Sequence, residues 1–356
     1  MERPRPRGRR AVFAAGAVLA LAGCGDAAYY GQAIGGHLEV MGRARPVEAW
    51  LADPAASAPL KQRLHGAQRL REFSVQDLKL PDNPSYRRYA DLQRPAAVWN
   101  VVAAPELSLE LKTWCFPVLG CVSYRGYFDK AAAEALAAQL RVEGWEASVY
   151  PVPAYSTLGW SNWMGGDPLL NTFVGGTEAE LARLMFHELA HQQLYVADDS
   201  LFNESFATAV ERIGVERWLQ AQGSAAQREQ FRLAQQRRQD FRDLTQRTRR
   251  ALQALYASDA SAEAKRQGKA ALLAQMRDDA AQLKATRWGG FAGYDAWFAQ
   301  ANNASLGVLG TYNDLADAFE RLYRQQGGDF ERFYAEAARI GELPTAQRHA
   351  TLRAIE

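Results

Sequence analysis

Residues 187–191 read His-Glu-Leu-Ala-His, and this pattern limits what the chain can fold into more than any other stretch. It lies in an apolar run that favours a helix, where residues four positions apart lie on the same face. His187 and His191 can therefore bind one metal ion between their imidazoles. Glu188 lies about 100° round the helix, where its carboxylate can reach a water molecule on that metal. The pattern predicts a zinc site with Glu188 as general base, rather than two histidines on the surface of a helix.

The first 24 residues have the composition of an export signal. Five arginines and one glutamate lie within residues 1–10, and an apolar run covers residues 11–21. That run is too short to span a bilayer as a helix of the mature protein. Residues 21–24 read Leu-Ala-Gly-Cys and resemble the lipobox of bacterial lipoproteins, whose cysteine is lipidated after cleavage. We therefore expect a signal peptide over residues 1–23 and a lipid anchor at Cys24; the alternative is an ordinary signal peptide with an incidental cysteine.

The predicted location follows from this leader. By analogy with lipoprotein sorting, Gly25 after the cysteine favours the outer membrane. We expect a protein of the cell envelope that faces the periplasm and contacts the membrane through the lipid at Cys24. The net charge of +2 and the sequence pI near 8.4 give no indication of a nucleic-acid partner, and none is expected.

The two remaining cysteines fit an oxidising compartment. Cys115 and Cys121 lie close in sequence, with Pro117 and Gly120 between them to turn the chain. Such a pair closes a small loop as a disulfide outside the cytoplasm, and two cysteines without further ligands make a poor zinc site. We predict a structural disulfide rather than free thiols.

The pattern of apolar residues divides the mature chain into four parts. Strands are expected at 98–102, 107–113, 122–128 and 148–152, with a helix at 129–142. The prolines of 148–152 indicate an edge strand, since proline cannot donate to a sheet ladder. Thr177 and Glu180 predict the start of the helix that carries the histidines. The predicted parts are an N-terminal helical segment (24–95), a catalytic lobe (96–222), a helical hairpin (223–286) and a helical C-terminal subdomain (287–356).

The order of these elements is that of a zincin-like peptidase lobe, in which a small mixed sheet is followed by an active-site helix. The fold class expected is therefore α+β, with helical parts before and after the lobe. By analogy, the edge strand can bind the backbone of a peptide substrate by β-addition.

A third metal ligand is indicated by residues 203–207, which read Asn-Glu-Ser-Phe-Ala. They resemble the Asn-Glu-x-Phe-Ala element of gluzincins, whose glutamate is the third zinc ligand. The resemblance implies that His187, His191 and Glu204 bind the zinc. Glu211 lies seven residues further on nearly the same helix face, either as an alternative ligand or as a carboxylate beside the site. Twelve residues separate His191 from Glu204, so the turn between the two helices must be tight.

Segments spread over most of the chain are similar to a family of bacterial lipoproteins described as predicted aminopeptidases. They are residues 30–37, 115–121, 154–160, 187–211 and 302–304. The resemblance implies a zinc metallopeptidase, an aminopeptidase by the family's description, that acts on peptides. The chain lacks the Gly-x-Met-Glu-Asn element that holds a free amino terminus in alanyl aminopeptidases. Aminopeptidase and endopeptidase activity therefore both stay open.

Further residues are candidates for the site. Gluzincins often use a tyrosine to steady the oxyanion formed when water attacks the peptide carbonyl, and Tyr155 and Tyr312 are the candidates here; either can equally be a core or rim aromatic. Thr208 follows Glu204 by one turn and can orient a ligand. Asp198 and Asp199 are expected to cap the second helix.

Two other functions remain possible from the sequence. One is zinc-dependent hydrolysis of another amide, such as a cell-wall peptide. The other is a lipoprotein scaffold that keeps the fold without turnover, against which Glu188 argues, because a binding protein needs metal ligands but no base. The predicted hairpin is basic, with eight arginines against three acids in residues 224–256. That face can serve an acidic partner or anionic lipid, or simply be solvated.

Overall fold

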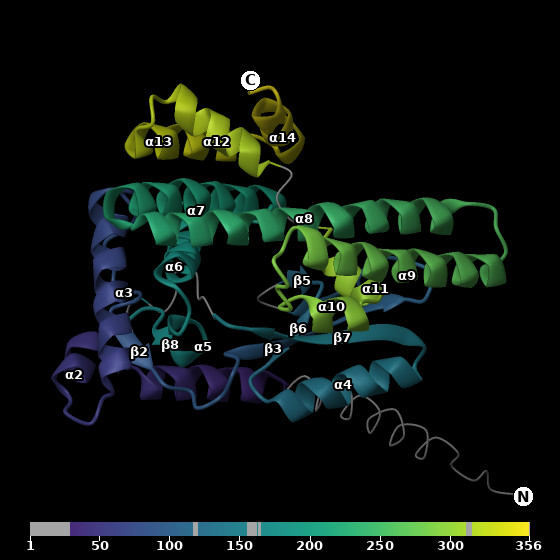
Figure 1. The fold of residues 1–356 in the computed structure, drawn as a ribbon, viewed down its shortest axis with the longest axis horizontal. Coiled ribbons are helices and arrows are strands. Elements are labelled where there is room, and N and C mark those ends of the chain that lie inside the picture. The colour runs from purple at the N-terminus through teal and green to yellow at the C-terminus, as the bar shows by residue number, and fades with distance from the viewer. Residues whose placement is uncertain (1–28, 117–119, 155–161, 163–164, 311–314, 356) are drawn as a thin grey trace, which may run out of the picture.

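The computed structural model describes residues 29–116, 120–154, 162, 165–310 and 315–355. It shows an α+β protein that is mostly helical, with three small sheets among the described residues (Figure 1). The α+β class predicted from the sequence is confirmed. In the described part of the chain, every helix is too short or too polar to cross a membrane.

Residues 29–43 form the first described helix. The later helices are α2 (Val47–Ala52), α3 (Ala58–Gln76), α4 (Lys130–Val142), α5 (Asn171–Val174), α6 (Glu178–Gln193), α7 (Ser200–Gln222), α8 (Ala225–Ala257), α9 (Ala262–Thr286), α10 (Asp295–Gln300), α11 (Asn303–Val308), α12 (Ala316–Gln325), α13 (Phe330–Gly341) and α14 (Thr345–Arg353). The strands are β1 (Arg45–Pro46), β2 (Arg88–Ala90), β3 (Val98–Pro105), β4 (Trp114–Phe116), β5 (Gly120–Val122), β6 (Arg125–Tyr127), β7 (Trp145–Val152) and β8 (Leu169–Leu170).

The largest sheet has the strand order β6-β3-β7, and both pairings are antiparallel. Among the described strands β7 pairs with β3 alone, so β7 is the edge strand that its prolines predict. Side chains of β3 alternate between two layers, as a strand with both faces covered requires. Val101 and Ala103 pack against α4, whereas Val102 and Ala104 pack against Ala304 of α11. The sheet is therefore a middle layer between two helices.

Two smaller sheets complete the strand pairing. β2 lies between β1, to which it is antiparallel, and β8, to which it is parallel. β4 and β5 form an antiparallel pair in which Cys115 lies opposite Cys121. The two sulfur atoms are joined as a disulfide.

The helices α3, α6, α7, α12 and α13 share the main hydrophobic core. In Figure 1 the C-terminal helices α12–α14 lie over α7 on the side away from α6. Gly214 of α7 lets α6 approach closely, since a Cβ there would lie 2.9 Å from the Phe186 ring and 2.7 Å from Leu78. Thr177 caps α6 through a hydrogen bond from the Glu180 amide, as predicted.

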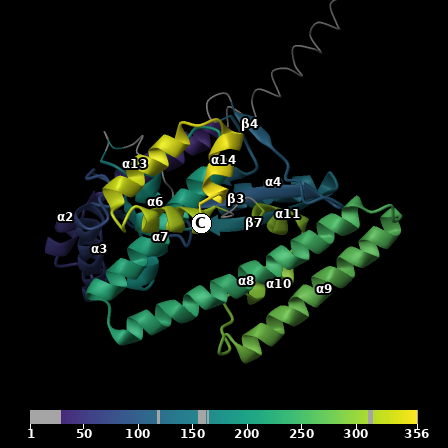
Figure 2. The ribbon, with the colours of Figure 1, turned by 90° about the horizontal axis from the view of Figure 1, so that it is seen from above.

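The helices α8 and α9 form the expected hairpin, which extends beyond the rest of the molecule in Figure 2. Its own core is smaller and consists mainly of Leu244, Leu252, Leu273 and Met276. Lys269 of α9 is ion-paired with Glu146 of β7, which ties the hairpin to the sheet.

The strand predicted at 107–113 is wrong, because the structure has no strand there. Leu109 packs into the hairpin core and Leu111 lies against the layer between β3 and α11. The alternation of leucines therefore reflects an irregular segment with two packed sides, which periodicity alone cannot distinguish from a strand. The strand predicted at 122–128 is in fact split between β5 and β6.

Candidate metal centre and its cleft

The turn between α6 and α7 sets the position of the second half of the site. α6 ends at Gln193 and α7 begins at Ser200. Asn203 fixes this turn from inside α7, because its side chain accepts from the Val196 amide at 2.8 Å and donates to the Val196 carbonyl at 2.7 Å. Asp199 caps α7 by accepting from the Phe202 amide, as predicted. The tight turn required by the sequence is thus built by local hydrogen bonds.

His187, His191 and Glu204 are brought together as the sequence predicts. One ligand atom from each residue lies within 4.8 Å of the others. Nε2 of His187 lies 3.3 Å from one carboxylate oxygen of Glu204, and Nε2 of His191 lies 3.6 Å from the other. Two imidazole nitrogens and a carboxylate are a donor set that suits zinc, and catalytic zinc sites use three protein ligands.

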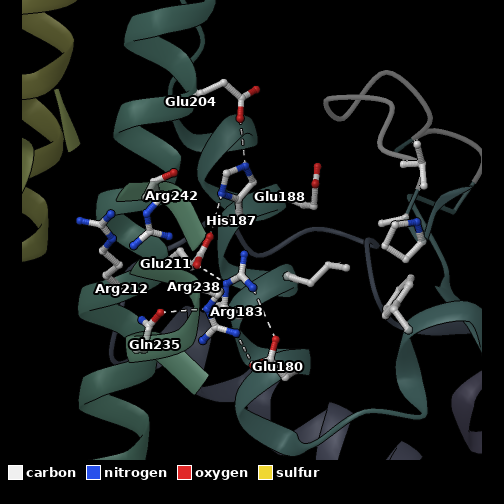
Figure 3. Close-up of a pocket in the computed structure, with 16 residues that line it drawn as sticks. Glu180, Arg183, His187, Glu188, Glu204, Glu211, Arg212, Gln235, Arg238 and Arg242 are labelled. Atoms are coloured by element: carbon white, nitrogen blue, oxygen red, sulfur yellow. Dashed lines mark hydrogen bonds and ion pairs between the residues drawn. The ribbon is translucent and has the colours of Figure 1, made fainter. Parts of the chain in front are cut away.

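Glu211 lies on the other side of His187 and is not one of these three ligands. Its carboxylate lies 3.1 Å from Nδ1 of His187, and it is ion-paired with Arg183, as Figure 3 shows. A metal-binding histidine usually donates its second N–H to a carboxylate, which fixes the ring and its tautomer. Glu211 therefore orients His187 so that Nε2 faces Glu204.

The charges of the site favour a cation between these residues. Burial lowers the pKa of His187, but hydrogen bonds with Glu204 and Glu211 outweigh it and raise this pKa to about 10. Burial would raise the pKa of Glu204, but the His187 hydrogen bond and the His191 charge hold it below its usual value. Burial and the neighbouring His187 lower the pKa of His191 to about 4, so this imidazole is neutral, as a metal ligand must be. The positive charge between Glu204 and Glu211 is carried by a proton on His187, and a metal cation at Nε2 would take the place of that proton.

His191 offers a second observation. Its Nδ1 is buried and has no hydrogen-bond partner in the described part of the chain. Nε2 is then the nitrogen that faces Glu204, and the residues present fit a zinc ion held by His187, His191 and Glu204.

The site opens into a cleft of about 470 Å³. His187, Glu188 and Glu204 line it, and so do Pro153 and Ala154, which follow the end of β7. The general base predicted at Glu188 therefore shares one cleft with two of the ligands and with the chain leaving the edge strand.

Four arginines form one wall of the cleft: Arg183 of α6, Arg212 of α7, and Arg238 and Arg242 of α8. In Figure 3, Arg212 and Arg242 lie on the side of His187 away from Glu188, and Arg183 and Arg238 lie between His187 and Glu180. Nothing in the motif indicated these residues. For Arg238 and Arg242 the excess of arginine in residues 224–256 was the available signal, and the fold places these two in the cleft.

Several predicted residues cannot be placed. Tyr155, Tyr312 and Cys24 lie outside the described residues. Thr208 is buried and lines the cleft, as its position one turn after Glu204 predicts.

Two tyrosines near the site were missed by the sequence analysis. Partial burial raises the pKa of Tyr124, whose side chain is still 45 % exposed, and neighbouring groups that include Tyr150 and Glu204 add to the shift. Burial raises the pKa of Tyr86 strongly, and the charge of Glu188 adds to it. Tyr86 has a backbone φ of +65°, a strained conformation for a bulky residue that is found most often at functional sites. Neither tyrosine lies in a motif, so only their packing could reveal them.

Comparison with known protein families matches residues 28–352 to the family described as "Putative aminopeptidase". The match covers most of the chain, so this protein belongs to that family. No curated protein and no solved structure matches the chain.

Proposed function

We propose that this protein is a zinc metallopeptidase of gluzincin type, whose catalytic lobe is zincin-like and whose zinc ligands are His187, His191 and Glu204. The observation that carries the proposal is the set of three ligand atoms within 4.8 Å, in the same cleft as Glu188. Membership of the aminopeptidase family supports a peptide substrate. The lipobox-like sequence at Cys24 supports a lipid anchor and a place in the cell envelope facing the periplasm.

The residues of the cleft can divide the work of peptide hydrolysis. When bound, zinc lowers the pKa of a coordinated water molecule and polarises the peptide carbonyl. Glu188 accepts the proton of the attacking water and returns it to the leaving amine nitrogen as the C–N bond breaks. Glu211 holds His187 in position throughout. The edge of β7 is the surface to which the substrate backbone can add as a further strand.

Changing Glu188 to Gln tests this proposal. The amide keeps the size of the side chain but cannot accept the proton, so kcat should fall by about 10²- to 10⁴-fold. Zinc content should stay at about one ion per chain, because Glu188 is not a ligand. The assay is turnover of a peptide library with free and blocked N-termini, which also separates aminopeptidase from endopeptidase activity.

Three outcomes would contradict parts of the proposal. Full activity of the Glu188→Gln variant would show that Glu188 is not the general base. Zinc binding without cleavage of any peptide would favour a scaffold protein without turnover. Cleavage of cell-wall peptides alone would show that these are the substrates.

A further inference from the structure

The arginine wall of the cleft is largely neutralised by carboxylates of the protein. Arg183 is ion-paired with Glu211 and with Glu180. Glu180 also pairs with Arg238 at 2.7 Å. Arg212 lies 2.9 Å from both Asp317 and Glu320 of α12.

Arg242 differs from its neighbours. It lines the cleft and is half-buried, yet in the described part of the chain it forms no ion pair with a carboxylate. Its guanidinium donates to the amide oxygen of Gln239 at 2.6 Å, which leaves other N–H groups for a ligand. Burial lowers the pKa of Arg242, and the positive charges of Arg212, Arg238 and Arg183 lower it further, against a smaller opposing effect of Asp243. A half-buried cation close to three other arginines is costly, and a bound anion would offset that cost.

Arg238 supplies a second donor on the same wall. Its Nη2 is buried and has no hydrogen-bond partner in the residues that the structure describes. Arg238 lies one turn before Arg242 on α8, so both side chains lie on the face that lines the cleft. Two guanidinium groups on one face make a site that matches the planar shape of a carboxylate.

We propose that Arg242, with Arg238, binds a carboxylate of the peptide substrate while the scissile bond lies beside His187 and Glu188. This inference rests on the proposed peptidase function and names its substrate class. The carboxylate belongs either to the C-terminus of a short peptide or to an acidic side chain. The chemistry of recognition is the same in both cases, and experiment separates them.

The test is a binding measurement that does not depend on turnover. The zinc-loaded Glu188→Gln protein is titrated calorimetrically with three versions of one neutral peptide: the C-terminal amide, the C-terminal free acid, and the amide with one Gln replaced by Glu. One or both acidic versions should bind about tenfold or more tightly than the amide, because a charge-assisted hydrogen bond is lost without the carboxylate. Whichever acidic version gains affinity identifies the source of the carboxylate.

The same titration with Arg242→Gln added should bring the ratio of the Kd values close to one, and Arg242→Lys should restore part of it. Arg250→Gln is the matched control, because Arg250 is an exposed arginine of the same helix that does not line the cleft; it should keep the full ratio. Equal binding of the three peptides to the protein with Arg242 intact would overturn the inference, and so would an unchanged ratio in Arg242→Gln. Failure of the proposed function would show differently, as absence of peptide turnover by the wild-type protein.

Discussion

The helix pairs α6–α7 and α8–α9 both contribute side chains to the cleft, but they are held in different ways. α7 is buried on most sides: Phe206 contacts the rings of Phe319, Phe333 and Tyr334, which come from helices more than 100 residues later. The hairpin buries one stripe of α8, which includes Leu244 and Leu252, in a small core of its own.

This difference separates two tasks of the site. The proposed metal ligands stand on helices fixed by packing that involves much of the fold, so their geometry can be held within narrow limits. The arginines of α8 stand on an element with fewer constraints. We therefore expect changes in α6–α7 to remove metal and activity, and changes in the hairpin to alter substrate preference.

The largest effect is expected from changing Glu204 to Gln. The amide keeps the shape of the side chain but removes the negative charge that faces both histidines. Zinc content should fall from about one ion per chain to near zero, and peptide turnover to background. Metal analysis and turnover measure the two losses, and circular dichroism confirms that the fold is kept. Unchanged zinc affinity would show that Glu204 is not a ligand.

The second prediction compares the two cores directly. Phe206→Ala should lower the free energy of unfolding by about 3 to 5 kcal/mol, because a large ring leaves a cavity in rigid surroundings. Leu252→Ala in the hairpin should cost about 2 kcal/mol, at the lower end of such losses, since the smaller core can close around the gap. Urea unfolding of the zinc-loaded protein measures both.

Zinc affinity of these two variants sharpens the comparison. Phe206 lies in the same helix as Glu204, two positions on, whereas Leu252 belongs to the separate hairpin core. Phe206→Ala should therefore weaken zinc binding and Leu252→Ala should not. Equal loss of zinc in both variants would show that the two regions are not independent.

A smaller effect is expected from Glu211→Gln. The partner of Nδ1 of His187 would become a neutral amide instead of a carboxylate. His187 would then be held less firmly, and its Nε2 would be a weaker metal ligand. Loss of such a partner typically costs 10- to 100-fold in metal affinity, and we expect a change of about this size. Competition with a chelator measures it. A loss as large as that of Glu204→Gln would make Glu211 a ligand after all.

Local rules were enough to predict the centre of the site. His187 and His191 face one way because positions four apart on any helix do so. Glu204 came from the resemblance of residues 203–207 to the gluzincin element. The turn between the helices was predicted to be tight, and Asn203 of that same element builds it. The edge position of β7 followed from proline chemistry.

The rest of the site depends on packing that sequence spacing does not contain. Arg242 is 38 positions beyond Glu204, so its place in the cleft is decided by how the hairpin lies on the lobe. Tyr86 precedes Glu188 by about 100 residues in the sequence, yet the charge of Glu188 raises its pKa. The wrong strand prediction at 107–113 has the same origin. The leucines of this segment alternate because they pack against two neighbouring layers, not because they lie in a sheet.

The smallest effect concerns acid stability at the turn that leads into α7. Asp199 is buried and is ion-paired with Arg348, and His349 of α14 lies 2.9 Å away. Burial alone would raise the pKa of Asp199, but the Phe202 amide, Arg348 and His349 together lower it below 3.8. A carboxyl group whose pKa is lower in the folded state stabilises the fold above its unfolded value, and this contribution is lost as the pH falls through the folded pKa. The free energy of unfolding should therefore drop as the pH falls below about 4.

Asp199→Asn isolates this contribution. The amide keeps the oxygen that caps Phe202 but cannot ionise, so the variant should be less stable than wild type at neutral pH and should lose less on acidification. Urea unfolding between pH 3 and pH 7 compares the two profiles. Parallel profiles would mean that other carboxyl groups cause the acid sensitivity. Profiles that converge at low pH would show that the ionised carboxylate of Asp199, which contacts both α7 and α14, supplies this stability.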